Sequence, residues 1–230
     1  MKFLYLALIL ASTSTCTKKQ MPTVTPPTQS TGFTYLALGD SYTIGERVGE
    51  QERFPVQLVD SLKTQGVNVA TSRIIARTGW TTDELKQAIE ASDLTTKSTF
   101  DMVTLLIGVN NQYRGRSIEA YKPEFKELLN RAIQFAGGKK EHVFVVSIPD
   151  YAYTPFGKGN ASISAGIDAY NAANEAISRE IGVAYINITP ISREGLNDPT
   201  LVASDGLHPS GKQYSRWVNL IVPAVLKSLK

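Results

Sequence analysis

Short apolar runs alternate with longer amphipathic segments from residue 33 to the end of the chain. The runs cover residues 35–38, 67–75, 102–107, 143–148 and 183–188. Most are nearly continuous in Val, Ile and Leu, which is typical of parallel strands covered by helices on both faces. We therefore expect an α/β fold, a three-layer sandwich around a five-stranded parallel sheet. Its ligand crevice would lie at the carboxyl ends of the strands, at a switch point beside the first one.

Start and stop residues mark the predicted helices between these runs. Pro55 suits the first turn of one helix, and Gly66 suits its end. Thr81 and Glu84 fit a capping box at the start of the next helix. A pair of glycines follows the third helix, and Gly182 ends the fourth. These signals agree with the strand–helix alternation.

Apolar side chains recur at helical spacing in most of these segments. The residues predicted to face inward are Val56, Val59 and Leu62, then Phe125, Leu128, Leu129, Ala132, Ile133 and Ala136, then Ile163, Ile167, Tyr170, Asn174, Ile177 and Ile181, and finally Trp217, Leu220, Ile221 and Val225. The last helix follows Pro209, and Pro223 should kink it or begin its final segment. The sequence contains no internal repeat, and the pattern indicates one domain over residues 33–230.

Composition and charge exclude some classes of protein. Of the 230 residues, 42% are hydrophobic and 20% are charged, which is ordinary for a folded globular domain. The net charge is only +3, and no cluster of Lys and Arg with interleaved aromatic residues occurs. A nucleic-acid partner is therefore not expected.

The first residues have the pattern of an export signal. Lys2 precedes an apolar run over residues 3–11 and then small residues, so residues 1–15 are predicted to be a signal peptide rather than an uncleaved anchor helix. Cys16, the only cysteine, follows directly and fits a bacterial lipidation site, although plain signal cleavage stays open. Residues 16–32 are polar and proline-containing, as in a disordered tether. We expect a protein of the bacterial cell envelope (periplasm or outer-membrane surface), attached to the membrane by this lipid anchor only.

A serine, a histidine and an aspartate occur where a hydrolytic site needs them. Ser41 follows the first strand in the turn Gly39-Asp40-Ser41-Tyr42. A hydroxyl nucleophile needs a base, and the base needs an orienting group. His208 lies three residues after Asp205, so the carboxylate can hold one ring nitrogen and leave the other for Ser41. The alternatives are a helix-capping serine and a loop histidine held by Asp205. His142, the other histidine, is predicted to be a surface residue.

Two more residues follow predicted strands at the same edge. Gly79 comes after the second strand, and Asn110 comes after the third. A backbone N–H and an amide side chain are suitable donors to the oxyanion of acyl transfer. The alternatives are turn geometry for Gly79 and an Asx-turn for Asn110.

In this order, the motifs resemble the four blocks of the SGNH hydrolases, also called GDSL-type esterases. The serine block resembles Gly39-Asp40-Ser41-Tyr42, the glycine block resembles the surroundings of Gly79, and the third block resembles Gly108-Val109-Asn110-Asn111. The last block matches Asp205-Gly206-Leu207-His208. The chain departs from the family pattern in having Asn111 where Asp is usual and Tyr42 in place of the namesake leucine.

The resemblance implies a flavodoxin-like hydrolase domain over residues 33–230 and a role for each matching residue. Ser41 would be the nucleophile, His208 the general base and Asp205 the group that orients it. The backbone N–H groups of Ser41 and Gly79 and the side chain of Asn110 would form the oxyanion hole. Family members use no metal and no organic cofactor. The Asn111 position is expected to support its loop rather than to react.

The substrate is predicted only by class: a small ester, with acetylated carbohydrate favoured because no long apolar lid is evident. The loop 151–157, which follows the fourth strand, has aromatic side chains that suit a sugar platform or an acyl wall. The candidate pocket residues are Trp80, Asn111, Tyr113, Arg114, Tyr151 and Tyr153. The open alternatives are a lysophospholipase or thioesterase of the same family, a non-catalytic carbohydrate-binding lipoprotein, and a flavin binder.

Overall fold

A single parallel sheet forms the centre of the molecule. The computed structural model describes residues 32–229, so the predicted signal peptide and Cys16 lie outside the described residues. The strands are β1 (Phe33–Gly39), β2 (Val69–Ala76), β3 (Met102–Leu106), β4 (Val143–Val146) and β5 (Ala184–Ile186). They pair in the order β2-β1-β3-β4-β5, and every pair is parallel. The predicted five-stranded parallel sheet is confirmed, and its strand order reverses beside β1, as expected for a ligand crevice at that point.

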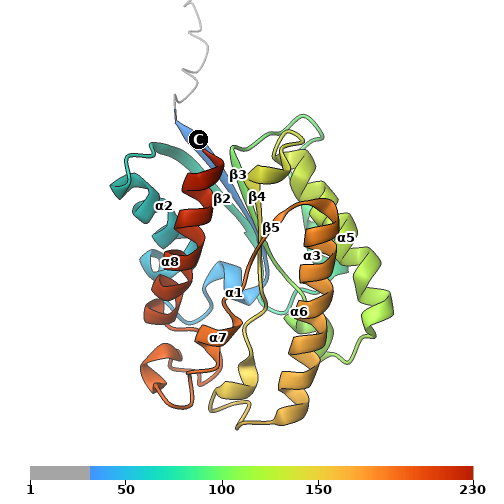
Figure 1. Cartoon of the computed structure of the whole chain (residues 1–230), viewed down its shortest axis with the longest axis vertical. Coiled ribbons are helices and arrows are strands. Elements are labelled where there is room, and N and C mark those ends of the chain that lie inside the picture. The colour runs from blue at the N-terminus through green and yellow to red at the C-terminus, as the bar shows by residue number, and fades with distance from the viewer. Residues whose placement is uncertain (1–31, 230) are drawn as a thin grey trace, which may run out of the picture. The chain divides into compact units, whose positions relative to one another are not determined.

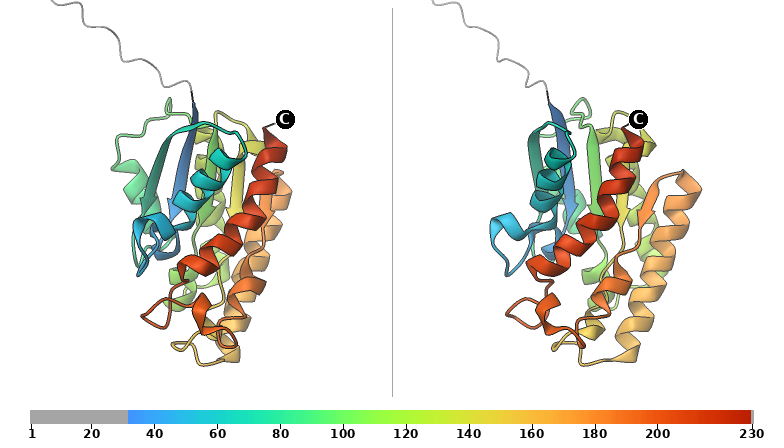
Figure 2. Two further views of the ribbon diagram at one scale, coloured as in Figure 1. Left: turned by 90° about the vertical axis from the view of Figure 1, so that its left-hand side faces the viewer. Right: turned by 60° about the vertical axis from the view of Figure 1, so that its left-hand side comes forward.

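Helices cover both faces of the sheet (Figure 1). The main helices are α2 (Phe54–Thr64), α3 (Thr82–Glu90), α5 (Ile118–Phe135), α6 (Ala161–Ile181) and α8 (Gly211–Ser228). Helices α2 and α8 lie against one face, and α3, α5 and α6 lie against the other, as the turned views also show (Figure 2). The predicted three-layer α/β sandwich is therefore confirmed.

Short helices gather at the carboxyl end of the sheet. They are α1 (Ser41–Ile44), α4 (Val109–Tyr113), α7 (Thr189–Ser192) and the 3₁₀ turns η3 (Tyr151–Tyr153) and η4 (Pro199–Leu201). Two further 3₁₀ turns are η1 (Glu50–Glu52) and η2 (Lys140–His142). His142 lies in η2, directly before β4, and therefore at the other end of the sheet. It was predicted to be a surface residue and is half-buried.

Several predicted helix boundaries are confirmed. Pro55 lies in the first turn of α2, and Gly182 ends α6 with a φ of 88°. The Glu84 carboxylate accepts the backbone N–H of Thr81 at 2.9 Å, as the predicted capping box requires. Each cap satisfies backbone groups that the helix itself leaves without a partner.

One inward-facing prediction is wrong. Leu220 is 44% exposed, because the buried stripe of α8 runs through Tyr214, Val218 and Ile221 on the other side of Trp217. The predicted residues Ile133, Ile163 and Ile181 are half-buried and pack against the core, and Val56 is half-buried at the edge of its stripe. Helix α8 continues through Pro223 to Ser228, so Pro223 does not begin a separate helix.

Within residues 32–229, no helix is both long and apolar enough to cross a bilayer.

Candidate active site

Ser41 is the first residue of α1, immediately beyond β1. The Asp40 carboxylate caps this helix by accepting the Tyr42 backbone N–H at 3.0 Å. A Cβ atom on Gly39 would lie 2.4 Å from the Leu106 carbonyl oxygen, so only glycine lets the chain turn here. Ser41 is itself buried. The turn therefore places Ser41 at the carboxyl edge of the sheet.

Asp40 has an unusual environment directly beside Ser41. Its side chain is fully buried, and its second oxygen, Oδ2, has no hydrogen-bond partner. Burial raises the pKa of Asp40 to about 7, because a charged carboxylate is poorly solvated there. We therefore assign Asp40 to helix capping rather than to orientation of a base.

Asp205 holds His208 through its ring and its backbone. His208 Nδ1 and Asp205 Oδ2 are 2.6 Å apart, and Asp205 Oδ1 accepts the backbone N–H groups of Leu207 and His208 at 3.0 Å each. Burial raises the pKa of Asp205, but the hydrogen bonds from His208 and Leu207 outweigh burial and bring the pKa below its ordinary value. An ionised carboxylate only accepts, so Nδ1 is the protonated nitrogen and Nε2 is left as an acceptor.

The loop that bears His208 is fixed by further contacts. The Ala203 N–H donates to the His208 carbonyl at 2.7 Å, next to an antiparallel bridge between Val202 and Pro209. The ring of Tyr42 packs edge-on against the imidazole, with centroids 5.7 Å apart. Backbone and ring contacts together restrict the orientation of His208.

Gly79 occupies the tight turn that follows β2. The Trp80 N–H donates to the Arg77 carbonyl at 3.3 Å, which places Gly79 at the third position of a β-turn with a φ of +87°. Type II turns need a positive φ at this position, and glycine adopts it without strain. Arg114 Nη2 donates to the Gly79 carbonyl at 2.6 Å and supports the turn from outside.

Asn110 lies in α4, beyond β3, and faces the same turn. Its Nδ2 donates one hydrogen to the Trp80 carbonyl at 3.0 Å. Because a carbonyl only accepts, this bond fixes which end of the amide is nitrogen. The second Nδ2 hydrogen stays available to a ligand.

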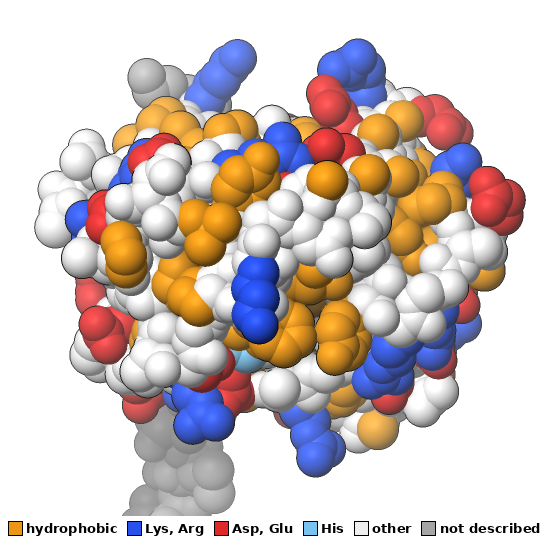
Figure 3. Space-filling view, turned by 90° about the horizontal axis from the view of Figure 1, so that it is seen from below, with side chains coloured by type: hydrophobic (Ala, Val, Ile, Leu, Met, Phe, Trp, Pro, Cys, Tyr) orange, Lys and Arg blue, Asp and Glu red, His pale blue; other side chains and the backbone are white. Residues whose placement is uncertain are grey.

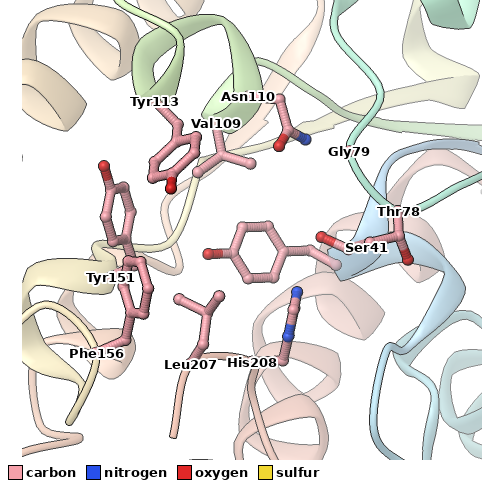
Figure 4. A pocket seen from close by; sticks show the side chains of 11 residues that line it. Ser41, Thr78, Gly79, Val109, Asn110, Tyr113, Tyr151, Phe156, Leu207 and His208 are labelled. Atoms are coloured by element: carbon pink, nitrogen blue, oxygen red, sulfur yellow. The ribbon is translucent and has the colours of Figure 1, made fainter. Parts of the chain in front are cut away.

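One pocket brings most of these residues together (Figure 4). It has a volume of about 230 Å³. Figure 4 shows Ser41 and His208 on one side and the aromatic rings of Tyr113, Tyr151 and Phe156 on the other. The lining residues are Ser41, Tyr42, Thr78, Gly79, Val109, Asn110, Tyr113, Tyr151, Phe156, Leu207 and His208. Hydrophobic side chains also gather on the surface of this end of the molecule (Figure 3).

Four of the predicted pocket residues are not among the lining residues. Trp80 contributes its carbonyl to Asn110, and Arg114 contributes a bond to Gly79. Asn111 is buried and bonds to Thr82 twice, accepting its N–H at 3.1 Å and donating to its hydroxyl at 2.6 Å. The ring of Tyr153 lies 6.0 Å from the guanidinium carbon of Arg193. These residues support the loops around the pocket.

Besides Phe156, which belongs to the predicted aromatic loop 151–157, the pocket contains four residues that the sequence did not single out as lining. They are Tyr42, Thr78, Val109 and Leu207. Each is the direct neighbour in sequence of Ser41, Gly79, Asn110 or His208. Their position next to a predicted site residue is the feature of the sequence from which they could have been predicted.

Known proteins with the same sequence pattern confirm the resemblance. A model of the GDSL-like lipase/acylhydrolase family matches residues 37–216. The chain belongs to this family. It is therefore an ester-hydrolysing enzyme. Among curated protein sequences, none matches the chain.

Solved structures share the fold of this GDSL-family chain. A lipase/acylhydrolase from Enterococcus faecalis is 20% identical with a TM-score of 0.64, over 84% of this chain and 95% of that one. An acetylxylan esterase from Geobacillus stearothermophilus is 18% identical with a TM-score of 0.61, over 86% and 94%. The psychrotrophic esterase EstA from Pseudoalteromonas sp. is 16% identical with a TM-score of 0.62, over 86% and 98%. At these identities the likeness establishes the fold.

No group of three or more His, Cys, Asp or Glu side chains converges on a possible metal position within residues 32–229. The groups that converge are a hydroxyl, an imidazole bonded to a carboxylate, and amide donors. Such a set is suited to acyl transfer through a serine.

Proposed function

We propose that this enzyme hydrolyses short-acyl esters, with Ser41 as nucleophile, His208 as general base and Asp205 as the group that orients His208. One observation carries the proposal: Ser41 and His208 line the same pocket while Asp205 Oδ2 lies 2.6 Å from His208 Nδ1. The carboxylate also favours the positive charge that the imidazole gains during the reaction. The unpaired Nε2 is then the proton acceptor for the Ser41 hydroxyl.

The reaction proceeds in two transfers. Ser41 Oγ attacks the ester carbonyl carbon while its proton passes to His208 Nε2. The tetrahedral intermediate collapses, the bond to the alcohol oxygen breaks, and Nε2 returns the proton to that oxygen. Water then attacks the acyl-enzyme with its proton taken by Nε2, and Ser41 regains a proton as the acid leaves.

Three donors are proposed to stabilise the oxyanion. They are the backbone N–H of Ser41, the backbone N–H of Gly79 and the free Nδ2 hydrogen of Asn110. The turn geometry of Gly79 and the bond from Asn110 to Trp80 support this role, because both hold a donor in place before the substrate arrives. A preorganised donor costs no reorganisation when the charge develops.

The pocket favours a small, uncharged ester. Its volume of about 230 Å³ is below the range of about 300–1,000 Å³ of drug-sized ligand sites. Its lining contains no Lys, Arg, Asp or Glu. The rim cation Arg114 already pairs with Glu84. An anionic thioester or lysophospholipid would find no free cation in the lining, so acetyl groups on carbohydrate fit better.

We also propose that the protein is exported and anchored through a lipid on Cys16. The sequence pattern of residues 1–32 supports this proposal.

The test is the release of acid from a panel of esters. We expect acetate from p-nitrophenyl acetate and acetylated xylan, with little hydrolysis of p-nitrophenyl laurate or lysophospholipid. Ser41→Ala should remove the activity, and Ser215→Ala, on the exposed side of α8, should keep it. A folded wild-type protein that hydrolyses none of these esters would favour the non-catalytic binding alternative.

A further inference from the structure

Two aromatic side chains at the pocket mouth remain open to solvent. Tyr113 is 62% exposed and Phe156 is 49% exposed, and their ring centroids are 6.4 Å apart. Among the described residues, the other exposed large hydrophobic side chains, Leu196 and Leu220, do not line the pocket. Exposed apolar surface that borders a pocket commonly marks a ligand-binding surface.

A third ring completes the aromatic group. Tyr151 lies 6.3 Å from Tyr113 and 6.2 Å from Phe156, measured between ring centroids. Its ring is buried, and its hydroxyl donates to Gln112 Oε1 at 2.9 Å. Tyr151 therefore braces the two exposed rings, which come from α4 and from the loop after η3.

The loop that bears Phe156 is held rigidly. The Phe156 N–H donates to the Gly206 carbonyl at 2.9 Å, and the Lys158 N–H donates to the Thr154 carbonyl at 2.8 Å. A Cβ atom on Gly157 would lie 2.0 Å from the Tyr151 carbonyl oxygen, so the chain passes very close to itself here. The backbone at Phe156 is thus held before a ligand arrives, which lowers the entropy cost of ordering this loop on binding.

The same loop is anchored at its start. Asp150 is fully buried and accepts hydrogen bonds from Arg193 Nε at 2.9 Å and from the Ser164 hydroxyl at 2.7 Å. The Ser192 hydroxyl accepts the Asp150 backbone N–H at 2.8 Å. These bonds tie the loop to α6 and α7.

The rings lie on the leaving-group side of the site. The general acid must reach the oxygen of the departing alcohol, so the alcohol lies beside His208. Leu207 precedes His208, and Figure 4 shows Leu207 between His208 and the ring of Phe156. The bond from Phe156 to Gly206 joins the same two segments. An alcohol group that extends from His208 along Leu207 therefore meets Phe156 and Tyr113.

We propose that Tyr113 and Phe156, braced by Tyr151, form a platform for the sugar ring of a neutral, O-acylated carbohydrate, an inference that rests on the proposed esterase function. The carbon–hydrogen face of a pyranose packs against flat aromatic faces, which supply large contact area with few rotatable bonds. The uncharged lining suits a neutral sugar. The open edge at Tyr113 lets further sugar units extend into solvent.

The test compares two acetyl esters that differ in the alcohol. We expect Tyr113→Ala and Phe156→Ala each to lower kcat/KM for an acetylated xylo-oligosaccharide by about tenfold, mainly through KM. The loss on ethyl acetate, which has no ring to stack, should be clearly smaller, so that the ratio of kcat/KM on the sugar ester to kcat/KM on ethyl acetate falls in each variant. Leu196→Ala is the matched control, because it removes another exposed apolar side chain that lies away from the pocket.

The possible outcomes separate this proposal from the esterase assignment. An equal loss on both esters, or no loss on the sugar ester, would overturn the platform while leaving the esterase intact. Binding of the same oligosaccharide to Ser41→Ala protein, measured by NMR titration, provides a readout without catalysis. Ring-dependent binding by a protein that hydrolyses no ester would support the platform and reject the esterase.

Discussion

The two sides of the pocket are built differently. On the catalytic side, Ser41 and His208 are buried. The Asp40 carboxylate caps the helix that Ser41 begins, and the Asp205 carboxylate holds the His208 ring. On the aromatic side, Tyr113 and Phe156 are exposed, and their rings contact only each other and the buried ring of Tyr151 among the aromatic side chains. In the proposed mechanism, bond making requires exact placement of a few polar atoms, whereas recognition of the alcohol requires contact area. Substitutions on the catalytic side should therefore affect every ester, and those on the aromatic side should select among esters.

The largest expected effect is at Ser41. Ser41→Ala should lower kcat by roughly 10⁴-fold or more on ethyl acetate and on an acetylated sugar alike, because no other group can form the acyl-enzyme. Steady-state kinetics on both esters measure it, with Ser215→Ala as control. Substantial activity of the variant on either ester would show that Ser41 is not the nucleophile.

Asp205→Asn should lower kcat by roughly 10³-fold, since an amide no longer stabilises the imidazolium or its tautomer. The folded protein lowers the pKa of Asp205, so the ionised carboxylate stabilises the fold. This stabilisation is fully present above the ordinary carboxyl pKa near 4. It is lost as the pH falls below that value and through the lowered pKa. The stabilities of variant and wild type should converge only at such acid pH. Asp198→Asn, another carboxyl of lowered pKa, is the control. A wild-type rate for Asp205→Asn would reject its role.

Asn110→Ala should lower kcat by roughly 10²-fold with little change in KM, because its donor acts mainly in the transition state. Asn219→Ala, on the exposed side of α8, is the matched control. A change in KM alone would mean that Asn110 binds the ground state and does not contribute to the oxyanion hole.

The smallest expected effect is at Gly79. Gly79→Ala should lower kcat by roughly tenfold, because a side chain disfavours the positive φ by about 1–2 kcal/mol and turns the N–H away. Gly182→Ala has the same strain, with a φ of 88° and no atom within 4 Å of the added carbon. Thermal unfolding should show similar losses for both variants, while only Gly79→Ala loses activity. Equal activities would remove Gly79 from the oxyanion hole.

Most of the fold could be predicted from the sequence, because buried parallel strands require long apolar runs. The run before Gly39 and the run before Gly108 both became strands that end at the site. Strand β5 is only three residues long, because its pairing with β4 is limited to the three residues opposite 144–146. Leu220 was mistaken for a core residue because it lies one turn from Trp217, at the border of the buried stripe.

The sequence predicted which polar side chains lie together where the proposed chemistry requires a particular residue, as at Ser41, Asp205 and His208. The residues that line the pocket without a chemical role were harder to predict. Trp80 and Arg114 lie beside predicted donors, yet they contribute support rather than lining, because short loops do not specify which way a side chain points. Leu207 lines the pocket simply because it precedes His208.

The most direct test of the central claim is labelling of the native protein with a fluorophosphonate, followed by peptide mass spectrometry. The mechanism predicts a single adduct on Ser41, with ester hydrolysis lost in proportion to labelling, and far slower labelling of folded His208→Ala protein. A folded, active protein that takes no label at Ser41, or that keeps its activity after full labelling there, would contradict the account.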